Sequence, residues 1–111
     1  MAVKKEFSFP SVSGLADIHA CSFFPEDKES VKAVIQIAHG MAEHLERYEK
    51  FAGVLCDNGF AVYINDHLGH GKSVKDDSEL GYFGEKDGWK NFIDDAHQLM
   101  QIAKKENPSK P

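Results

Sequence analysis

The class of fold follows from one stretch of this 111-residue chain, "VKAVIQIAHG", residues 31–40. Its apolar residues form a short, nearly unbroken run that is rich in β-branched side chains and is closed by Gly40. Such a run is typical of a strand that is buried on both faces of a parallel sheet. We therefore expect a strand at about Lys32–His39.

A helical pattern and a second buried strand follow this stretch. In "EHLERYEKFAGVLCDNG", residues 43–59, the apolar residues recur at helical spacing along one face. These residues are Leu45, Tyr48, Phe51, Ala52 and Leu55. Gly59 is expected to end the helix, because glycine readily takes the left-handed conformation that closes one. "FAVYIND", residues 60–66, then predicts another buried strand.

A last helix is predicted before the C-terminus. Its apolar stripe consists of Trp89, Phe92, Ile93, Ala96, Leu99, Met100 and Ala103. Asp87 is its expected N-cap. "NPSKP", residues 107–111, should end it because proline cannot continue a helix.

The N-terminal quarter alternates polar and apolar residues. "KKEFSFP", residues 4–10, and "ADIHACSFF", residues 16–24, flank the turn signal "SVSG". Period-two alternation around a turn predicts an antiparallel hairpin. Together with the strand–helix–strand–helix order that follows, it predicts an α/β fold: a mostly parallel sheet with an antiparallel N-terminal hairpin and covering helices.

Net charge, apolar runs and cysteine spacing argue against several classes of function. The formal net charge of -5 disfavours nucleic acid as the main partner and disfavours adhesion to an anionic membrane. No apolar run is long enough for stable membrane insertion, and the N-terminus does not resemble a signal peptide. Cys21 and Cys56 are far apart and are expected to be two reduced core thiols. A cytoplasmic protein is therefore expected.

The segment "DHLGHGKS", residues 66–73, ends like a phosphate-binding loop. That motif requires glycine where this chain has Asp66, and a carboxylate there would repel phosphate. A metal site could use Asp66, His67 and His70, with His39 and His44 from elsewhere. Loop histidines hydrogen-bonded to the backbone are the favoured interpretation, so neither a metal nor a cofactor is expected.

The segment "IAHGMAEH", residues 37–44, lies where a buried strand is expected to give way to a helix. In open parallel sheets, ligands bind beyond the carboxyl ends of the strands. Backbone amides in such a turn can stabilise negative charge, and Gly40 permits close approach. An ordinary tight turn explains the same residues, and the residues by themselves do not separate the two interpretations.

Two motifs in order carry a resemblance to a known family. "HGMAEHLERY", residues 39–48, followed by "NDHLGHGKS", residues 65–73, resembles the N-terminal half of the α/β-hydrolase superfamily. The branch is that of monoacylglycerol lipases and lysophospholipases, also described as serine aminopeptidase-like. The resemblance extends from about Phe7 to the C-terminus. It implies that residues 66–73 form a structural loop beyond the fourth strand, held in place by its polar side chains.

The resemblance also implies roles for individual residues. The backbone N–H of Met41 would be one oxyanion-hole donor, acting on the charge that develops on a carbonyl oxygen. The residues that would shape or brace this loop are His39, Gly40, Glu43 and His44. Arg47 could reach a polar end of the substrate, although a surface ion pair is the slightly favoured interpretation. The implied activity is hydrolysis of a carboxylic ester, such as a monoacylglycerol or a lysophospholipid.

One part of the family pattern is missing from this sequence. The family's nucleophile lies in a G-x-S-x-G turn after the fifth strand, and this chain contains no G-x-S-x-G. Residues 1–111 are therefore expected to be a partial α/β-hydrolase domain that ends before the nucleophile and is inactive alone. A non-catalytic binding or interaction module is the alternative. In the family's strand order, 1-2-4-3-5, the third strand lies between the fourth and the fifth. Without the fifth strand its edge would be exposed, so a homo-oligomer through Ala33–Ala38 is expected.

Overall fold

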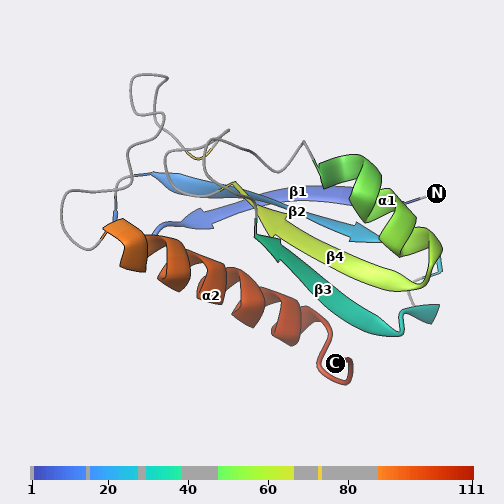
Figure 1. Ribbon diagram of the computed structural model, residues 1–111. Coiled ribbons are helices and arrows are strands. Elements are labelled where there is room, and N and C mark those ends of the chain that lie inside the picture. The colour runs from blue at the N-terminus through green and yellow to red at the C-terminus, as the bar shows by residue number, and fades with distance from the viewer. Residues whose placement is uncertain (1, 15, 28–29, 39–47, 67–72, 74–87) are drawn as a thin grey trace.

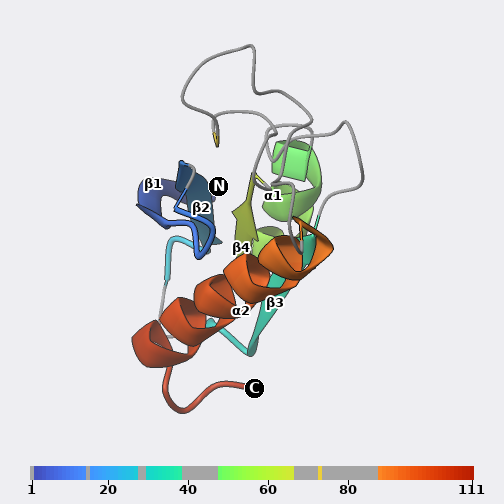
Figure 2. The ribbon, with the colours of Figure 1, turned by 90° about the vertical axis from the view of Figure 1, so that its left-hand side faces the viewer.

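The computed structural model describes residues 2–14, 16–27, 30–38, 48–66, 73 and 88–111. Its elements, in chain order, are β1 (Val3–Pro10), β2 (Asp17–Phe24), β3 (Ala33–Ala38), α1 (Glu49–Asp57), β4 (Phe60–Asn65) and α2 (Gly88–Glu106). Figure 1 shows the strands in one twisted sheet, with α1 on one face and α2 on the other. The turned view in Figure 2 shows α2 running across its face of that sheet.

The strand order is β1-β2-β4-β3. β1 and β2 pair antiparallel, as the N-terminal alternation predicted, and β3 and β4 pair parallel. The fold class is thus confirmed, and the described sheet is mixed because β2 also meets β4 in the antiparallel sense. Only the pair that is connected through α1 is parallel, as a helical crossover requires.

β4 is the most deeply buried strand. β3 is less buried than the sequence predicted. Residues 61–65 of β4 are all buried, whereas β3 is only partly buried and Ala38 is exposed. The prediction of a β3 buried on both faces is wrong for a simple reason. β3 lies at the end of the described sheet and has a strand neighbour on one side only.

The sheet separates two apolar clusters. The cluster under α2 consists of Phe9, Ile18, Ala20, Tyr63, Leu99 and Ala103. The cluster under α1 consists of Cys21, Phe23, Ala52, Cys56, Val62 and Ile64. Both cysteines are buried free thiols, as predicted. Because successive strand residues point to opposite faces, β2 and β4 supply side chains to both clusters.

α1 ends as predicted, but its buried face is narrower than expected. Gly59 has φ 91°, the left-handed conformation that lets the chain turn from α1 into β4. Ala52 and Cys56 are buried against the sheet, whereas Phe51 is 53% exposed. The prediction for Phe51 is wrong because the contact is centred on the small side chains, and Phe51 points about 100° away from Ala52 around the helix.

α2 also packs through a narrower face than its apolar stripe suggested. Leu99 and Ala103 are buried, whereas Ile93 is 58% exposed and Met100 is exposed as well. The helix ends at Glu106, just before the proline-containing tail, as predicted. Neither described helix has the combination of length and apolar sequence that crossing a membrane requires.

The buried face of α2 contains a carboxylate that the stripe did not predict. Asp95 is fully buried, and its Oδ2 accepts a hydrogen bond of 2.7 Å from the Ser11 hydroxyl. Its Oδ1 accepts bonds from the Val12 amide at 2.9 Å and from Gln98 Nε2 at 3.1 Å. Burial raises the pKa of Asp95, and these three hydrogen bonds oppose that shift. Asp95 thereby joins α2 to the turn between β1 and β2.

A second polar contact holds the C-terminal end of α2 against β4. The buried Tyr63 hydroxyl donates a hydrogen bond to Glu106 and accepts one of 3.0 Å from Asn107 Nδ2. The Tyr63 ring packs edge-on against Phe24, with ring centres 5.9 Å apart. Burial, followed by the bond to Glu106, raises the pKa of the Tyr63 phenol. The phenol is therefore bound in its protonated form.

Replacing Asp95 with alanine is expected to destabilise the fold. Asp95→Ala removes the acceptor of the Ser11 and Val12 groups, and leaving such groups unpaired costs about 1–3 kcal/mol. Asp94→Ala is the matched control on the same helix and should change the free energy of unfolding by less than about 0.5 kcal/mol. Urea denaturation with an unchanged slope would measure both changes. Equal stability of the two variants would contradict the role of Asp95.

The Tyr63 phenol is expected to make stability depend on alkaline pH. Because its pKa is raised in the folded state, the unfolded chain loses the proton first. The stabilisation is complete below the ordinary tyrosine value of 10.0, and the free energy of unfolding should fall as pH rises through that value. In Tyr63→Phe this part of the fall should disappear. Denaturation curves for both proteins from neutral to alkaline pH test this, and identical pH profiles would refute it.

Candidate functional site

The residues that the sequence nominated for the site are His39, Gly40, Met41, Glu43, His44 and Arg47. All six lie outside the described residues. What the structure does describe is the frame around them, which is formed by the end of β3, the start of α1 and the end of β4. Ala38 is the register partner of Asn65, so β3 and β4 end side by side. β3 and β4 therefore end at the same edge of the sheet, and open parallel sheets bind ligands beyond such an edge.

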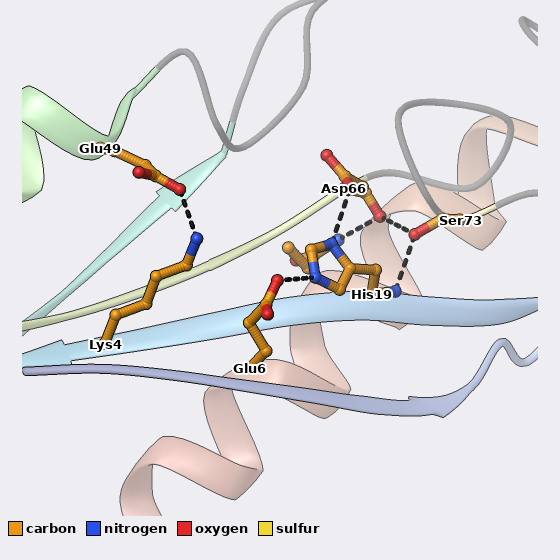
Figure 3. Close-up of polar contacts among 7 residues, drawn as sticks. Lys4, Glu6, His19, Glu49, Asp66 and Ser73 are labelled. Carbon is orange, nitrogen blue, oxygen red and sulfur yellow. Dashed lines mark hydrogen bonds and ion pairs between the residues drawn. The ribbon is translucent and has the colours of Figure 1, made fainter.

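Asp66 and Ser73, the two described residues of the segment 66–73, are tied to β2 (Figure 3). The Ser73 hydroxyl accepts a hydrogen bond of 2.9 Å from the His19 amide and donates one of 2.7 Å to the Asp66 carbonyl. The Asp66 amide donates a bond of 2.9 Å to the His19 carbonyl. Both residues are buried. These bonds confirm that polar groups hold the two described ends of this segment in place.

The same contacts argue against a phosphate-binding loop. In such a loop the final Ser hydroxyl faces a magnesium ion, whereas the fully buried Ser73 hydroxyl already bonds two backbone groups. The Asp66 carboxylate is turned toward His19. His67 and His70, which the sequence analysis considered as metal ligands together with Asp66, lie outside the described residues.

His19 lies at the centre of a polar cluster that the sequence analysis did not identify. Its Nδ1 lies 2.9 Å from Asp66 Oδ2, and its Nε2 lies 3.1 Å from Glu6 Oε1 (Figure 3). A serine, a histidine and an aspartate thus meet here without forming a catalytic triad. Ser73 bonds the backbone of His19, whereas a triad requires its hydroxyl to face the imidazole.

Cys21 completes the cluster on β2. Donor atoms of Glu6, His19 and Cys21 all lie within 4.8 Å of one another, so these residues could hold a metal ion. Burial raises the pKa of the Cys21 thiol to about 11. A thiol with that pKa is protonated at neutral pH and is a poor nucleophile unless a cation stabilises its thiolate.

An ion pair borders this cluster on the side of α1. The Lys4 ammonium bonds the Glu49 carboxylate, which connects β1 to the first turn of α1 (Figure 3). The bond to Glu49 raises the pKa of Lys4. Both side chains are about one-third exposed, so this pair adds little to stability.

Among the described residues, two cavities lie away from the ends of β3 and β4. One of about 290 Å³ lies between the first half of β3 and the C-terminal end of α2, next to Val34 and Met100. The other, of about 380 Å³, lies beside Phe24 and the tail after α2. Neither touches Ala38 or Asn65, where β3 and β4 end. The cavities therefore do not mark the edge at which the family motifs are expected to act.

Comparison with known proteins identifies the family to which the chain belongs. The profile described as serine aminopeptidase, S33, matches residues 29–111. Monoacylglycerol lipase of Mycolicibacterium smegmatis is 31% identical over 110 residues, which are 99% of this chain and 36% of that protein. Monoglyceride lipase of Homo sapiens is 32% identical over 80 residues, which are 72% of this chain and 24% of that protein.

A solved structure agrees with these relatives. The crystal structure of a highly thermostable carboxyl esterase from Bacillus coagulans in complex with glycerol superposes with a TM-score of 0.88 and 30% identity. The match covers 100% of this chain and 35% of that one. The chain thus spans about a third of the length of the proteins it matches over its whole extent. With the family profile covering residues 29–111, this chain belongs to the serine aminopeptidase S33 family of α/β-hydrolases.

Proposed function

We propose that this chain is the N-terminal portion of a serine hydrolase that cleaves carboxylic esters, with monoacylglycerols or lysophospholipids as substrates. The observation that carries the proposal is the similarity, over nearly the whole chain, to a bacterial protein named monoacylglycerol lipase. The strand order β1-β2-β4-β3 supports it, because the two family motifs follow the two strands that end side by side.

In the proposed mechanism this chain supplies part of the oxyanion hole. The backbone N–H of Met41 donates to the oxygen that becomes negative when a serine attacks the ester carbonyl. The loop that positions this N–H consists of His39, Gly40, Glu43 and His44. Arg47 contacts a polar end of the substrate. The serine, the histidine that moves its proton and the second oxyanion donor come from sequence beyond Pro111.

The backbone contact at the end of the chain supports a strand that continues beside β3. The Pro111 carbonyl accepts a hydrogen bond of 2.8 Å from the Val34 amide, on the side of β3 that faces away from β4. In the family, the chain continues from this position into the fifth strand and the nucleophile turn. We propose that the same pairing places the nucleophile near the ends of β3 and β4.

The buried free thiols fit a reducing compartment, since no disulfide joins Cys21 to Cys56. We therefore propose a cytoplasmic location.

The oxyanion role of Met41 predicts a difference between two substitutions in the full-length enzyme. Met41→Pro removes the backbone N–H, and kcat for a monoacylglycerol should fall about 100- to 1000-fold. Met41→Ala keeps the N–H and should change kcat much less. The 111-residue chain alone is the negative control and should not hydrolyse a short-chain nitrophenyl ester.

Three outcomes would count against this function. Equal kcat values for the proline and alanine variants would remove Met41 from the oxyanion hole. Turnover by the 111-residue chain that a serine-reactive phosphonate abolishes would mean that the nucleophile is already present. A full-length protein that hydrolyses no ester would favour the non-catalytic binding module.

The outer side of β3 predicts self-association of the 111-residue chain. Backbone groups of alternate residues face that side: the Val34 amide already donates to the Pro111 carbonyl, and the Gln36 amide is the next one to face outward. Beyond this contact the described residues place no strand on the outer side of β3; an exposed apolar edge pairs with another chain, so we expect a dimer or larger assembly through Ala33–Ala38. Gln36→Pro removes the outward amide and should give a monomer, because proline is tolerated on an edge strand.

Gln36→Ala is the matched control for this test. Both substitutions lose the 2.8 Å bond from the Gln36 side chain to the Ala96 carbonyl, but only proline loses the backbone amide. Light scattering should therefore find the alanine variant associated like the parent chain. A monodisperse monomer of the parent chain would refute pairing through β3.

A further inference from the structure

The register of the first two strands places three metal-binding side chains on one face of the sheet. Glu6 of β1 is the direct partner of Cys21 of β2. His19 lies two residues before Cys21, so its side chain points to the same face. Facing side chains on paired strands have Cβ atoms about 5 Å apart, within reach of one shared ion. A carboxylate, an imidazole and a thiol are thus gathered by backbone pairing alone.

The distances between the donor atoms are close to those of a tetrahedral site. All three lie within 4.8 Å of one another, and Glu6 Oε1 lies 3.1 Å from His19 Nε2. A tetrahedral zinc ion, with bonds of about 2.0–2.3 Å, holds its ligand atoms about 3.5 Å apart. A small movement of the Cys21 and Glu6 side chains therefore suffices to reach this geometry.

The orientation of the imidazole is fixed from the opposite side. Asp66 is 2% exposed, and its Oδ2 lies 2.9 Å from His19 Nδ1. A carboxylate that accepts the Nδ1 proton is the arrangement that aims the Nε2 lone pair at a metal ion. Without a cation or a second ring proton, the Nε2 lone pair would face the lone pairs of Glu6 Oε1 at 3.1 Å.

The cluster is closed on one side and open on the other. Cys21 is fully buried, the His19 side chain is 14% exposed and the Glu6 side chain is 52% exposed. An ion can therefore enter past Glu6 and bind against the sheet. Lys4, on the same strand as Glu6, bonds Glu49 on α1, and its positive charge also acts on Glu6 and Cys21.

We propose that Glu6, His19 and Cys21 bind a transition-metal ion of the zinc type, with water at a fourth position. The combination of nitrogen, sulfur and one carboxylate oxygen suits zinc and excludes magnesium and calcium, which prefer oxygen ligands alone. Binding releases the Cys21 thiol proton to solvent. The ion would join β1 to β2 and, through His19 and Asp66, would reach the end of β4. Segment 66–73 begins there, so the site would brace one end of the proposed substrate-binding edge.

Cobalt is the probe that tests this site, because a Co²⁺–thiolate bond absorbs light where the metal-free protein does not. Titration of the folded 111-residue chain with Co²⁺ should give this absorption, and Zn²⁺ should displace it. Cys21→Ser should abolish the absorption. Cys56→Ser is the matched control, since Cys56 is the other buried free thiol and lies outside the cluster, and it should leave the absorption unchanged.

Glu6→Gln keeps the test decisive if Cys21→Ser does not fold. The Glu6 side chain is half exposed, so this variant should fold, as circular dichroism can verify. Its affinity for Co²⁺ should fall at least about 10-fold, since even loss of an outer hydrogen-bond partner costs about 10- to 100-fold. Three results would overturn the proposal: no thiolate absorption from the folded chain, equal affinity in Glu6→Gln, or equal absorption from the urea-unfolded chain.

Discussion

The burial of β4 from residue 61 to residue 65 organises the rest of the molecule. β2 pairs with one side of this strand and β3 with the other, and its alternating side chains enter both apolar clusters. Tyr63 packs under α2, whereas Val62 and Ile64 pack under α1. The two helices therefore pack on opposite faces of the sheet, and β4 and β2 contribute side chains to both contacts. Because β4 ends beside β3, the two strands after which the family motifs occur in the sequence end at one edge of the sheet.

Features that depend on local sequence were predictable. Gly59 ends α1, proline follows the end of α2, and period-two alternation locates the N-terminal hairpin. Features that depend on contacts with other strands and helices were not predictable. The apolar run of β3 has the same pattern as a strand with two partners, but its burial depends on how many strands flank it. Phe51 and Met100 match a helical stripe, yet they are exposed, whereas the small residues Ala52 and Ala103 are buried.

The roles of the buried polar groups also depend on contacts with distant parts of the chain, and local sequence does not predict them. Asp95 looks like an interruption of an apolar stripe, and only the position of the Ser11 turn makes it a structural link. Glu6, His19 and Cys21 are unremarkable in sequence because the pattern that unites them is the register between two strands. The resemblance identified segment 66–73 as a structural loop, but the partner of that loop, His19, lies 54 residues before Ser73. A contact over that separation leaves no trace in local spacing.

The contacts of His19 restrict which residues can replace it. Its amide, its carbonyl and both ring nitrogens each have a partner, and these partners belong to β1, to the residue after β4 and to Ser73. No other side chain presents two nitrogen atoms on opposite sides of a rigid ring. Any replacement at position 19 leaves at least one carboxylate without its neighbour. Position 19 is therefore under a tighter chemical constraint than an exposed position such as Ile93 on α2.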